Sequence, residues 1–446
     1  MANSPYLSLR LILWAALLLA LAACRAPTPP PSPTPWPTSP LASQTPANRT
    51  PPPTLIEITP SRPLGPTLTP TLNQIAIWVD LPPAQRQKLA EEVAVFQETY
   101  PQYVVTLHSY AGSEALLGLV DADAEIDVVL ASPMLLNQLW AAEQLAPISD
   151  FLPAASIDEF AAATLSGARR DNTVWGLPDT AGFHLLLFYN QDLVESIPTD
   201  IDALAETAQA LNQAGHQALA VNSYDPLWVL PWLTPYGGRL TNAAGDPTLN
   251  SPAMIAALTL FQSWHQPPAA IAPLLTYEAA RAEFLAGDVA MMIDGDWALE
   301  TLPQTGNLAW EVAPLPSLGQ AEENRPAAPL ILARYWAVRR APQGDRALAV
   351  ADFLEYITRP ERQLAWTHTF GQLPTRREAL KAPAIVNDPR LRLSAMQMQA
   401  GQPPPFGLDP NRLLDAMRQP LREMIDGGLT PTQAAQAMQA NLTKEN

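Results

Sequence analysis

The chain has 446 residues, of which 48% are hydrophobic, enough for a sizeable buried core. Its 43 acidic side chains outnumber the 26 basic ones and give a formal net charge of −17 at pH 7. This balance argues against a nucleic-acid partner, because phosphate binding depends on Lys and Arg. It also argues against attachment to an anionic membrane surface through charge alone.

An apolar run from Leu11 to Ala23 follows Arg10 and ends at Cys24. The run is shorter than the about 20 residues that a membrane-spanning helix needs, and its flanks are those of an export signal. Residues 1–23 are therefore predicted to be a signal peptide. Cys24 is the only cysteine of the chain, which excludes an intramolecular disulfide and a Cys-rich metal site.

The segment Leu21-Ala22-Ala23-Cys24 resembles the lipobox of bacterial lipoproteins. The resemblance implies cleavage before Cys24 and lipidation of its sulfur, and therefore an extracytoplasmic protein that is anchored to the cell membrane. Two acyl chains on that residue are sufficient for stable anchoring. The alternative is an incidental or buried thiol.

Residues 24–73 are dominated by Pro, Thr and Ser, as in the stretch 27–35. Such composition favours an extended polyproline conformation and a linker that holds the folded part away from the membrane. The alternative is a ligand for a proline-recognising protein. From residue 74 the composition is that of a globular protein, and residues 74–446 exceed the about 250–300 residues at which single cores stop growing. Two lobes are expected.

The first elements of the globular part alternate between strand and helix. Residues 74–79, 103–108 and 126–130 are predicted strands, and helices are predicted up to Tyr100, after Gly112 and from Pro133. This alternation predicts an α/β fold with a parallel sheet and helices on both faces. Ligands of such sheets bind beyond the carboxyl ends of the strands, and the residues in those positions are Asp80, Ser109–Ser113 and Ala131-Ser132.

Two later helix starts carry capping signals. Ser251-Pro252 places an N-cap residue before a first-turn proline. Thr430-Pro431-Thr432-Gln433 has the spacing of a capping box at the start of the last helix.

The order and spacing of several stretches carry a family resemblance. The most specific stretch runs from Tyr277-Glu278-Ala279-Ala280 through Phe284–Met292 to Asp294-Gly295-Asp296-Trp297, and the others are 75–78, 96–101, 126–129, 175–178, 187–190, 314–316, 371–374 and 428–435. Together they resemble the family 1 extracellular solute-binding proteins, the group of the maltose- and multiple-sugar-binding proteins. The resemblance covers nearly the whole globular part.

The resemblance implies a two-lobed α/β fold of the type II periplasmic-binding-protein kind, with mixed, mostly parallel sheets and a hinged cleft. Lobe 1 is expected over 74–182 plus 327–372 and lobe 2 over 183–326 plus 373–446, with crossings near 180–184, 317–328 and 370–374. The resemblance also implies a monomer that captures a solute, with a carbohydrate favoured, and delivers it to the membrane permease of an ABC transporter. Catalysis and cofactors are not expected; the alternatives are a ligand-sensing lipoprotein and a carbohydrate-active hydrolase.

A sugar site combines aromatic platforms for the C–H face with a few fixed polar partners. Trp297 is the first candidate, because it matches the family's Gly-x-Trp segment; its alternative is packing of the next helix. Trp228 and Trp232 share one face of a predicted helix, which fits a platform or plain core. Tyr335 and Trp336 face opposite ways on a predicted strand over 330–338, and Tyr335 is preferred.

The polar partners are expected among Asp80, Ser132, Asp179 and Arg334, each with a solvated loop residue as the alternative. Two positions depart from the maltose-binding pattern: residues 412–415 lack an aromatic, and the crossing near Gly182 lacks an acidic residue. These departures argue against a maltodextrin.

Other motifs fail on their spacing. The segment from Asp121 has Ile126 and Ser132 where a calcium loop needs Gly and Glu, and the five histidines form no metal-ligand pattern, so no metal is expected. The chain also lacks the G-x-S-x-G, P-loop and G-x-G-x-x-G signatures.

Overall fold

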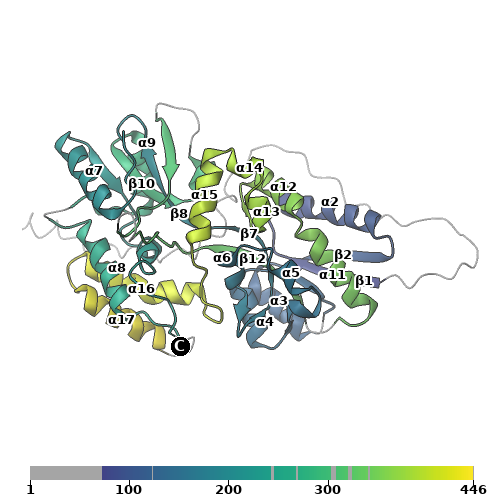
Figure 1. Ribbon diagram of the computed structural model, residues 1–446. Coiled ribbons are helices and arrows are strands. Elements are labelled where there is room, and N and C mark those ends of the chain that lie inside the picture. Colours follow the sequence, from purple (N-terminus) through teal and green to yellow (C-terminus); the bar gives the residue numbers. More distant parts are fainter. Residues whose placement is uncertain are drawn as a thin grey trace, which may run out of the picture. The chain divides into compact units, whose positions relative to one another are not determined.

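The computed structural model describes residues 73–122, 124–242, 246–267, 270–302, 308–319, 324–339 and 342–444. All of them belong to the compact unit Thr54–Asn446. The predicted signal peptide, Cys24 and the Pro-rich linker lie outside the described residues. Within the described part, the strands form a seven-stranded sheet, a four-stranded sheet and a two-stranded ribbon (Figure 1).

The strands fall into these three groups by hydrogen bonding. The seven-stranded sheet contains β1 (Asn73–Val79), β2 (Tyr103–Ser109), β3 (Val128–Ala131), β4 (Leu145–Ala146), β7 (Leu177–Gly182), β12 (Leu332–Arg339) and β13 (Leu373–Pro374). The four-stranded sheet contains β8 (Leu185–Asn190), β9 (Gln217–Ala220), β10 (Val289–Gly295) and β11 (Trp310–Ala313). The ribbon contains β5 (Arg169–Arg170) and β6 (Thr173–Val174).

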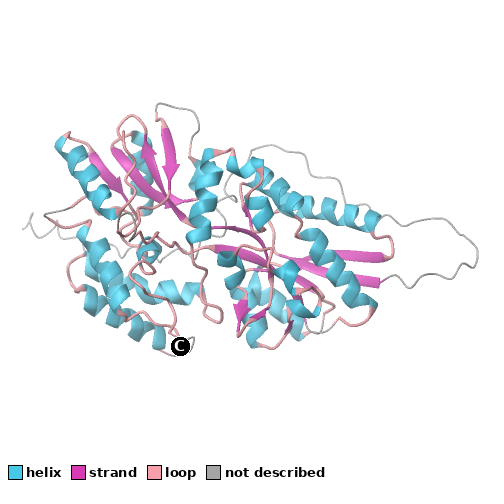
Figure 2. Cartoon of the chain, viewed as in Figure 1, coloured by secondary structure: helices cyan, strands magenta, loops and turns pink. Residues whose placement is uncertain are grey.

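Helices flank the strands of both sheets (Figure 2). In chain order they are α2 (Pro83–Thr99), α3 (Gly112–Asp121), α4 (Pro133–Ala141), α5 (Ala154–Ile157), α6 (Ala162–Ser166), α7 (Ile201–Gln213), α8 (Pro252–Ser263), α9 (Tyr277–Ala286), α10 (Ala298–Thr301), α11 (Asp345–Ile357), α12 (Pro360–Phe370), α13 (Arg377–Leu380), α14 (Pro383–Val386), α15 (Pro389–Ala400), α16 (Pro410–Ile425) and α17 (Pro431–Thr443). Short 3₁₀ turns are η2 (Ile148–Asp150), η3 (Pro226–Trp228) and η4 (Leu230–Trp232).

The predicted α/β class is confirmed, and the first predicted strands and helices coincide with β1, α2, β2, α3, β3 and α4. The sheets are mixed, but the expectation of mostly parallel strands is wrong. β1 pairs in parallel with β2 and β3, and β9 with β10, whereas β3, β4 and β7 run antiparallel to β12, β13 to β7, and β8 to both β10 and β11. Two consecutive strands can be parallel only when a crossover connects them within one sheet. β12 instead follows β11, which belongs to the four-stranded sheet.

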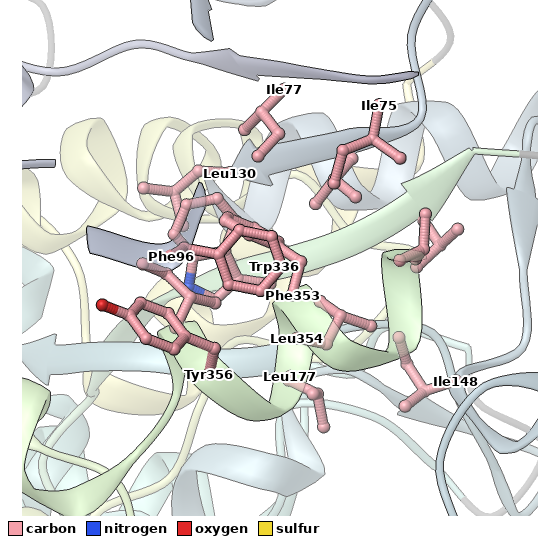
Figure 3. Close-up of a cluster of buried hydrophobic side chains, with 14 of the residues drawn as sticks. Ile75, Ile77, Phe96, Leu130, Ile148, Leu177, Trp336, Phe353, Leu354 and Tyr356 are labelled. Atoms are coloured by element: carbon pink, nitrogen blue, oxygen red, sulfur yellow. The ribbon is translucent and has the colours of Figure 1, made fainter. Parts of the chain in front are cut away.

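The seven-stranded sheet is covered on both faces. One face packs its strands against side chains of α2, α11 and α12, and Figure 3 shows Trp336 of β12 among Phe96, Phe353 and Tyr356 there. The Trp336 and Phe353 rings meet edge to face with centroids 5.7 Å apart. The other face packs against α3, α4 and α15 through residues such as Leu116, Leu136 and Met398. Both faces are therefore core.

The chain passes between the two sheets at identifiable places. β7 ends in the seven-stranded sheet at Gly182, and β8 begins in the four-stranded sheet at Leu185. The chain returns between β11 and β12, and β13 is its last strand. Only two residues separate β7 from β8, so the first passage is short and its backbone geometry is constrained.

Both predicted caps are present. Ser251 accepts the Met254 N–H at 3.1 Å at the start of α8. Thr430 accepts the Gln433 N–H at 3.3 Å, and the Gln433 side chain accepts the Thr430 N–H at 2.9 Å in return.

Replacing Thr430 by alanine is expected to lower the free energy of unfolding by about 1 kcal/mol, because one first-turn N–H of α17 loses its acceptor. Urea unfolding of the full chain measures the effect. Thr432→Ala is the matched control: Thr432 is exposed in the same helical turn, and its variant is expected to match the wild type. Equal stability of both variants would contradict a stabilising box.

Candidate functional site

The carboxyl ends of β1, β2 and β3 meet at one edge of the seven-stranded sheet, since Val79 lies in register with both Ser109 and Leu130. Asp80 follows β1, is exposed and accepts the Gly112 N–H at 3.0 Å. That contact orients the carboxylate while leaving acceptor capacity for a ligand hydroxyl.

Ser132 follows β3 at the same edge and is exposed. Its Oγ accepts the Leu135 N–H at 3.2 Å as the N-cap of α4. A hydroxyl that accepts one hydrogen bond still has its proton to donate. Ser132 therefore has a structural role and keeps a free donor toward solvent.

Asp179 lies inside the protein with no exposed surface. It forms an ion pair with Arg362 and accepts the Trp336 indole N–H at 3.0 Å, and its other oxygen lies 3.6 Å from Arg334 Nη2. A carboxylate enclosed in this way has no surface for a ligand. In this structure Asp179 is a core ion-pair residue.

Arg334, by contrast, keeps 22% of its side-chain surface exposed. Its guanidinium donates to Gln85 Oε1 at 2.8 Å, Thr180 Oγ1 at 2.9 Å and Gln372 Oε1 at 2.7 Å. These neutral acceptors fix the guanidinium plane, and the buried Asp179 carboxylate, 3.6 Å from Nη2, partly balances its charge. Arg334 is thus a fixed cation with a partly exposed surface.

Trp297 lies just after β10 and is partly exposed. Its Nε1–H donates to Tyr277 Oη at 2.8 Å, and its ring lies 5.0 Å from the Phe183 ring, centroid to centroid. The indole folds back over Gly295, where any Cβ would overlap the ring. This explains the Gly-x-Trp spacing: glycine at the first position makes room for the tryptophan.

The other predicted aromatic residues are buried. Trp228 donates to the Ile293 carbonyl at 2.7 Å, Trp232 to the Pro316 carbonyl at 3.2 Å, and Tyr335 to the Thr164 carbonyl at 3.0 Å. Their exposed fractions are 4%, 1% and 1%. Side chains so enclosed, with their polar atoms already paired, act here as core residues, and the structure does not bring them together with Trp297 into an exposed platform.

A polar network that the sequence reasoning did not identify supports Trp297. Arg281 donates to Tyr277 Oη at 3.1 Å and to Asp294 Oδ2 at 3.2 Å. Burial raises the pKa of Asp294 to about 6, while the Arg281 guanidinium lowers it. The available sequence signal was the most specific stretch of the family resemblance, which contains Tyr277, Arg281 and Asp294.

A second group missed from the sequence lies at the passage from β7 to β8. Asp296 accepts the Phe183 N–H through both carboxylate oxygens, at 2.9 and 3.1 Å. His184 is fully buried beside it, and burial lowers the pKa of His184 to about 3. Phe183 and Asp296 thus connect the passage between the sheets to the segment that carries Trp297.

Comparison with known proteins assigns the chain to a family. A maltotriose-binding protein of Pyrococcus abyssi is 24% identical over 328 residues, which cover 71% of this chain and 70% of that protein. The maltose/maltodextrin-binding domain of Bdellovibrio bacteriovorus, solved with maltotriose, superposes with a TM-score of 0.60 at 23% identity, covering 83% of this chain and 98% of that one. The cyclic α-maltosyl-1,6-maltose-binding protein of Arthrobacter globiformis superposes with a TM-score of 0.71 at 18% identity. This match covers 83% of this chain and 97% of that one.

These structural matches establish the two-lobed binding-protein fold. Across the part of the chain that the structure describes, no helix is long and apolar enough to span a membrane. Residues 93–392, which are 300 of the 446 residues, match the family described as bacterial extracellular solute-binding proteins. Since this match spans more than half of the chain, the protein is a member of the bacterial extracellular solute-binding protein family.

Proposed function

We propose that the protein is the sugar-binding lipoprotein of an ABC importer, and that the sugar binds between the two lobes with Trp297 as its main platform. The observation that carries the proposal is the state of Trp297. It is partly exposed and fixed by Tyr277 and Gly295 in a chain of the solute-binding family. A fixed, partly exposed indole suits the C–H face of a sugar ring.

Polar partners for the hydroxyls are proposed at Asp80, Ser132 and Arg334. Asp80 and Ser132 are exposed at one sheet edge, and Arg334 is partly exposed. Sugar hydroxyls that lose water without finding partners cost about 1–3 kcal/mol each. A fixed carboxylate and a fixed guanidinium supply both an acceptor and donors for them.

The relatives favour a glucose oligosaccharide over other sugars. The Pyrococcus abyssi relative is a maltotriose-binding protein, and the Bdellovibrio bacteriovorus domain was solved with maltotriose. From the sequence alone, the two departures argued against a maltodextrin; beside these relatives we propose instead that this chain makes different contacts to such a sugar. Leu413 and Leu414 are buried in α16 and offer no platform there.

Membrane attachment through a lipidated Cys24, with residues 24–73 as a linker, completes the proposal. Its support is the lipobox-like sequence together with the membership of an extracellular family. Two acyl chains are enough for stable anchoring, and the linker leaves the binding lobes free to meet a permease. Hinge closure on the sugar would give the permease a ligand-dependent surface to recognise.

A thermal-shift screen of the full chain tests the ligand class. Maltotriose, glucose, a polyol, an amino acid and a polyamine are added at millimolar concentration, and sugar turnover is followed in parallel. A ligand at 100 times its Kd stabilises the folded state by about 2.7 kcal/mol, so maltotriose is expected to raise the Tm by several degrees and remain unaltered. A rise with an amino acid or polyamine alone would overturn the sugar assignment, and hydrolysed maltotriose would favour an enzyme.

A further inference from the structure

The passage from β7 to β8 contains an unusual backbone conformation. Phe183 has φ of +65°, a left-handed conformation that is rare for a bulky side chain and persists only where its surroundings enforce it. Gly182 and His184 are its neighbours, and these residues join the seven-stranded sheet to the four-stranded sheet. Some contact must therefore hold Phe183 in place.

Asp296 provides that contact from the end of β10. Its two oxygens accept the Phe183 N–H, and its own N–H donates to the His184 carbonyl at 2.9 Å. The approach is close, because a Cβ at Gly182 would lie 2.6 Å from Asp296 Oδ2. The hydrogen bonds of Asp296 therefore fix the short passage between the sheets. Asp296 directly precedes Trp297 in the chain.

A Ser-His-Asp series runs through this site. His184 Nε2 lies 2.9 Å from Ser394 Oγ, and its Nδ1 lies 3.5 Å from Asp296 Oδ2. His184 and Ser394 have exposed fractions of 0% and 1%, so a substrate cannot reach the hydroxyl in this structure. The series is better explained as packing that holds Asp296 than as a nucleophile.

We propose that Asp296 is a positioning residue that holds Phe183 in its left-handed conformation and thereby couples Trp297 to the passage between the lobes. The Phe183 ring packs against the Trp297 ring with centroids 5.0 Å apart and the ring planes tilted by 39°, so a shift of either the passage or the indole is expected to move the other. The part of the inference that concerns ligand rests on the proposed function. The part that concerns Phe183 is independent of any ligand.

The ionisation of Asp296 makes its hydrogen bond to the Phe183 N–H dependent on pH, which can be measured. Burial raises the pKa of Asp296 to about 7, although backbone N–H donors, that of Phe183 first, lower it. The ionisable groups that face it are His184, which burial keeps neutral, and Glu300, whose pKa is raised by burial and by the charge of Asp296. The ionised form, which accepts the Phe183 N–H more strongly, becomes dominant as the pH rises through about 7.

Amide hydrogen exchange at Phe183 in the ligand-free full chain tests the positioning role. Asp296→Ala is expected to lower the protection of this amide at least tenfold, and Asp288→Ala, which removes an exposed carboxylate from the turn before β10, is expected to leave it unchanged. In the wild type the protection is expected to rise between pH 6 and 8 as Asp296 ionises. Asp296→Asn keeps an acceptor, so its protection is expected to persist but without that rise. Unchanged protection in Asp296→Ala, or an identical pH profile in Asp296→Asn, would overturn the proposal.

A double substitution tests the close approach. Gly182→Ala is expected to lower the Phe183 protection, since its Cβ displaces the carboxylate, and Gly182→Ala with Asp296→Ala is expected to be no worse than Asp296→Ala alone. Additive losses would contradict the contact. Circular dichroism verifies folding, and if Asp296→Ala does not fold, the pH profile of Asp296→Asn decides.

Maltotriose affinity, measured in parallel, is expected to fall about fivefold in Asp296→Ala and to be unchanged in Asp288→Ala. Absence of maltotriose binding in the wild type would count against the proposed function only. The exchange results would then still decide the role of Asp296.

Discussion

Replacing Arg362 by methionine is expected to lower the free energy of unfolding by about 3 kcal/mol, because breaking a buried ion pair is costly and the Asp179 carboxylate would keep only the more distant guanidinium of Arg334, at 3.6 Å, as its charged partner. Arg362 pairs with Asp179, donates from Nε to Glu92 at 2.9 Å and lies over the Trp366 ring at 4.1 Å. Asp179 has no exposed surface, so water cannot replace the lost guanidinium. Chemical denaturation of the full chain measures the loss.

Two further variants separate charge from packing. Arg359→Met is the matched control, because Arg359 is exposed at the start of the same helix and stacks on Tyr356; its loss is expected to stay within about 1 kcal/mol. Adding Asp179→Asn to Arg362→Met is expected to recover part of the stability, since a neutral amide costs less to bury than a carboxylate. If the double variant is less stable than Arg362→Met, the weakened pairing of the Asp179 carboxylate is not the cause.

The sequence was sufficient to predict the elements whose patterning is local. In α2, Leu89, Val93 and Phe96 recur at helical spacing and are all buried against the sheet. The Ser251 and Thr430 caps were also predicted correctly, because their signal lies within four residues. Such features depend on neighbours in the chain, so one sequence is enough.

The strand β12 illustrates what alternation alone leaves open. Tyr335 and Trp336 do face opposite sides of the sheet, as predicted, and each joins a different hydrophobic cluster. The prediction that Tyr335 meets ligand assumed that one face of the sheet is open. Helices cover both faces of this sheet, and coverage is a property of the whole fold rather than of the strand.

Trp228 and Trp232 show a second limit. The predicted helix is absent, and two 3₁₀ turns, η3 and η4, stand in its place. Pro226 and Pro231 begin these turns or lie within them, and a proline inside a helix removes a hydrogen bond and clashes with the preceding turn. The two prolines therefore argued against a continuous helix from the sequence alone. The carbonyl groups that accept the indole N–H bonds come from distant segments, which the sequence does not identify.

The contact between Phe183 and Asp296 had no sequence signal of its own. The sequence does not indicate that the backbone of a phenylalanine has a left-handed conformation. The two residues are also 113 positions apart in the chain. The only sequence signal near Gly182 is the lack of an acidic residue at this crossing. In the structure that glycine leaves the space that the Asp296 carboxylate occupies, and Asp296 lies in the turn that follows β10.

Replacing Trp297 by alanine is expected to weaken sugar binding at least tenfold, or by about 1.4 kcal/mol or more, while the Tm of the ligand-free protein stays within a few degrees. The indole is partly exposed and held by Tyr277, Gly295 and Phe183. Its removal therefore eliminates the platform and leaves only a limited cavity. Calorimetric titration with maltotriose, or with whichever sugar gives the largest thermal shift, measures the change.

Trp140→Ala provides the matched control for Trp297→Ala. Trp140 is also partly exposed and packs on Phe406 and under Arg170, but it lies on α4 beside the other sheet. Its variant is expected to bind sugar as tightly as the wild type, and Trp297→Phe is expected to retain part of the affinity because a ring remains. If Trp297→Ala instead unfolds the protein and Trp297→Phe restores only stability, the indole is a core residue, and the platform must be sought elsewhere.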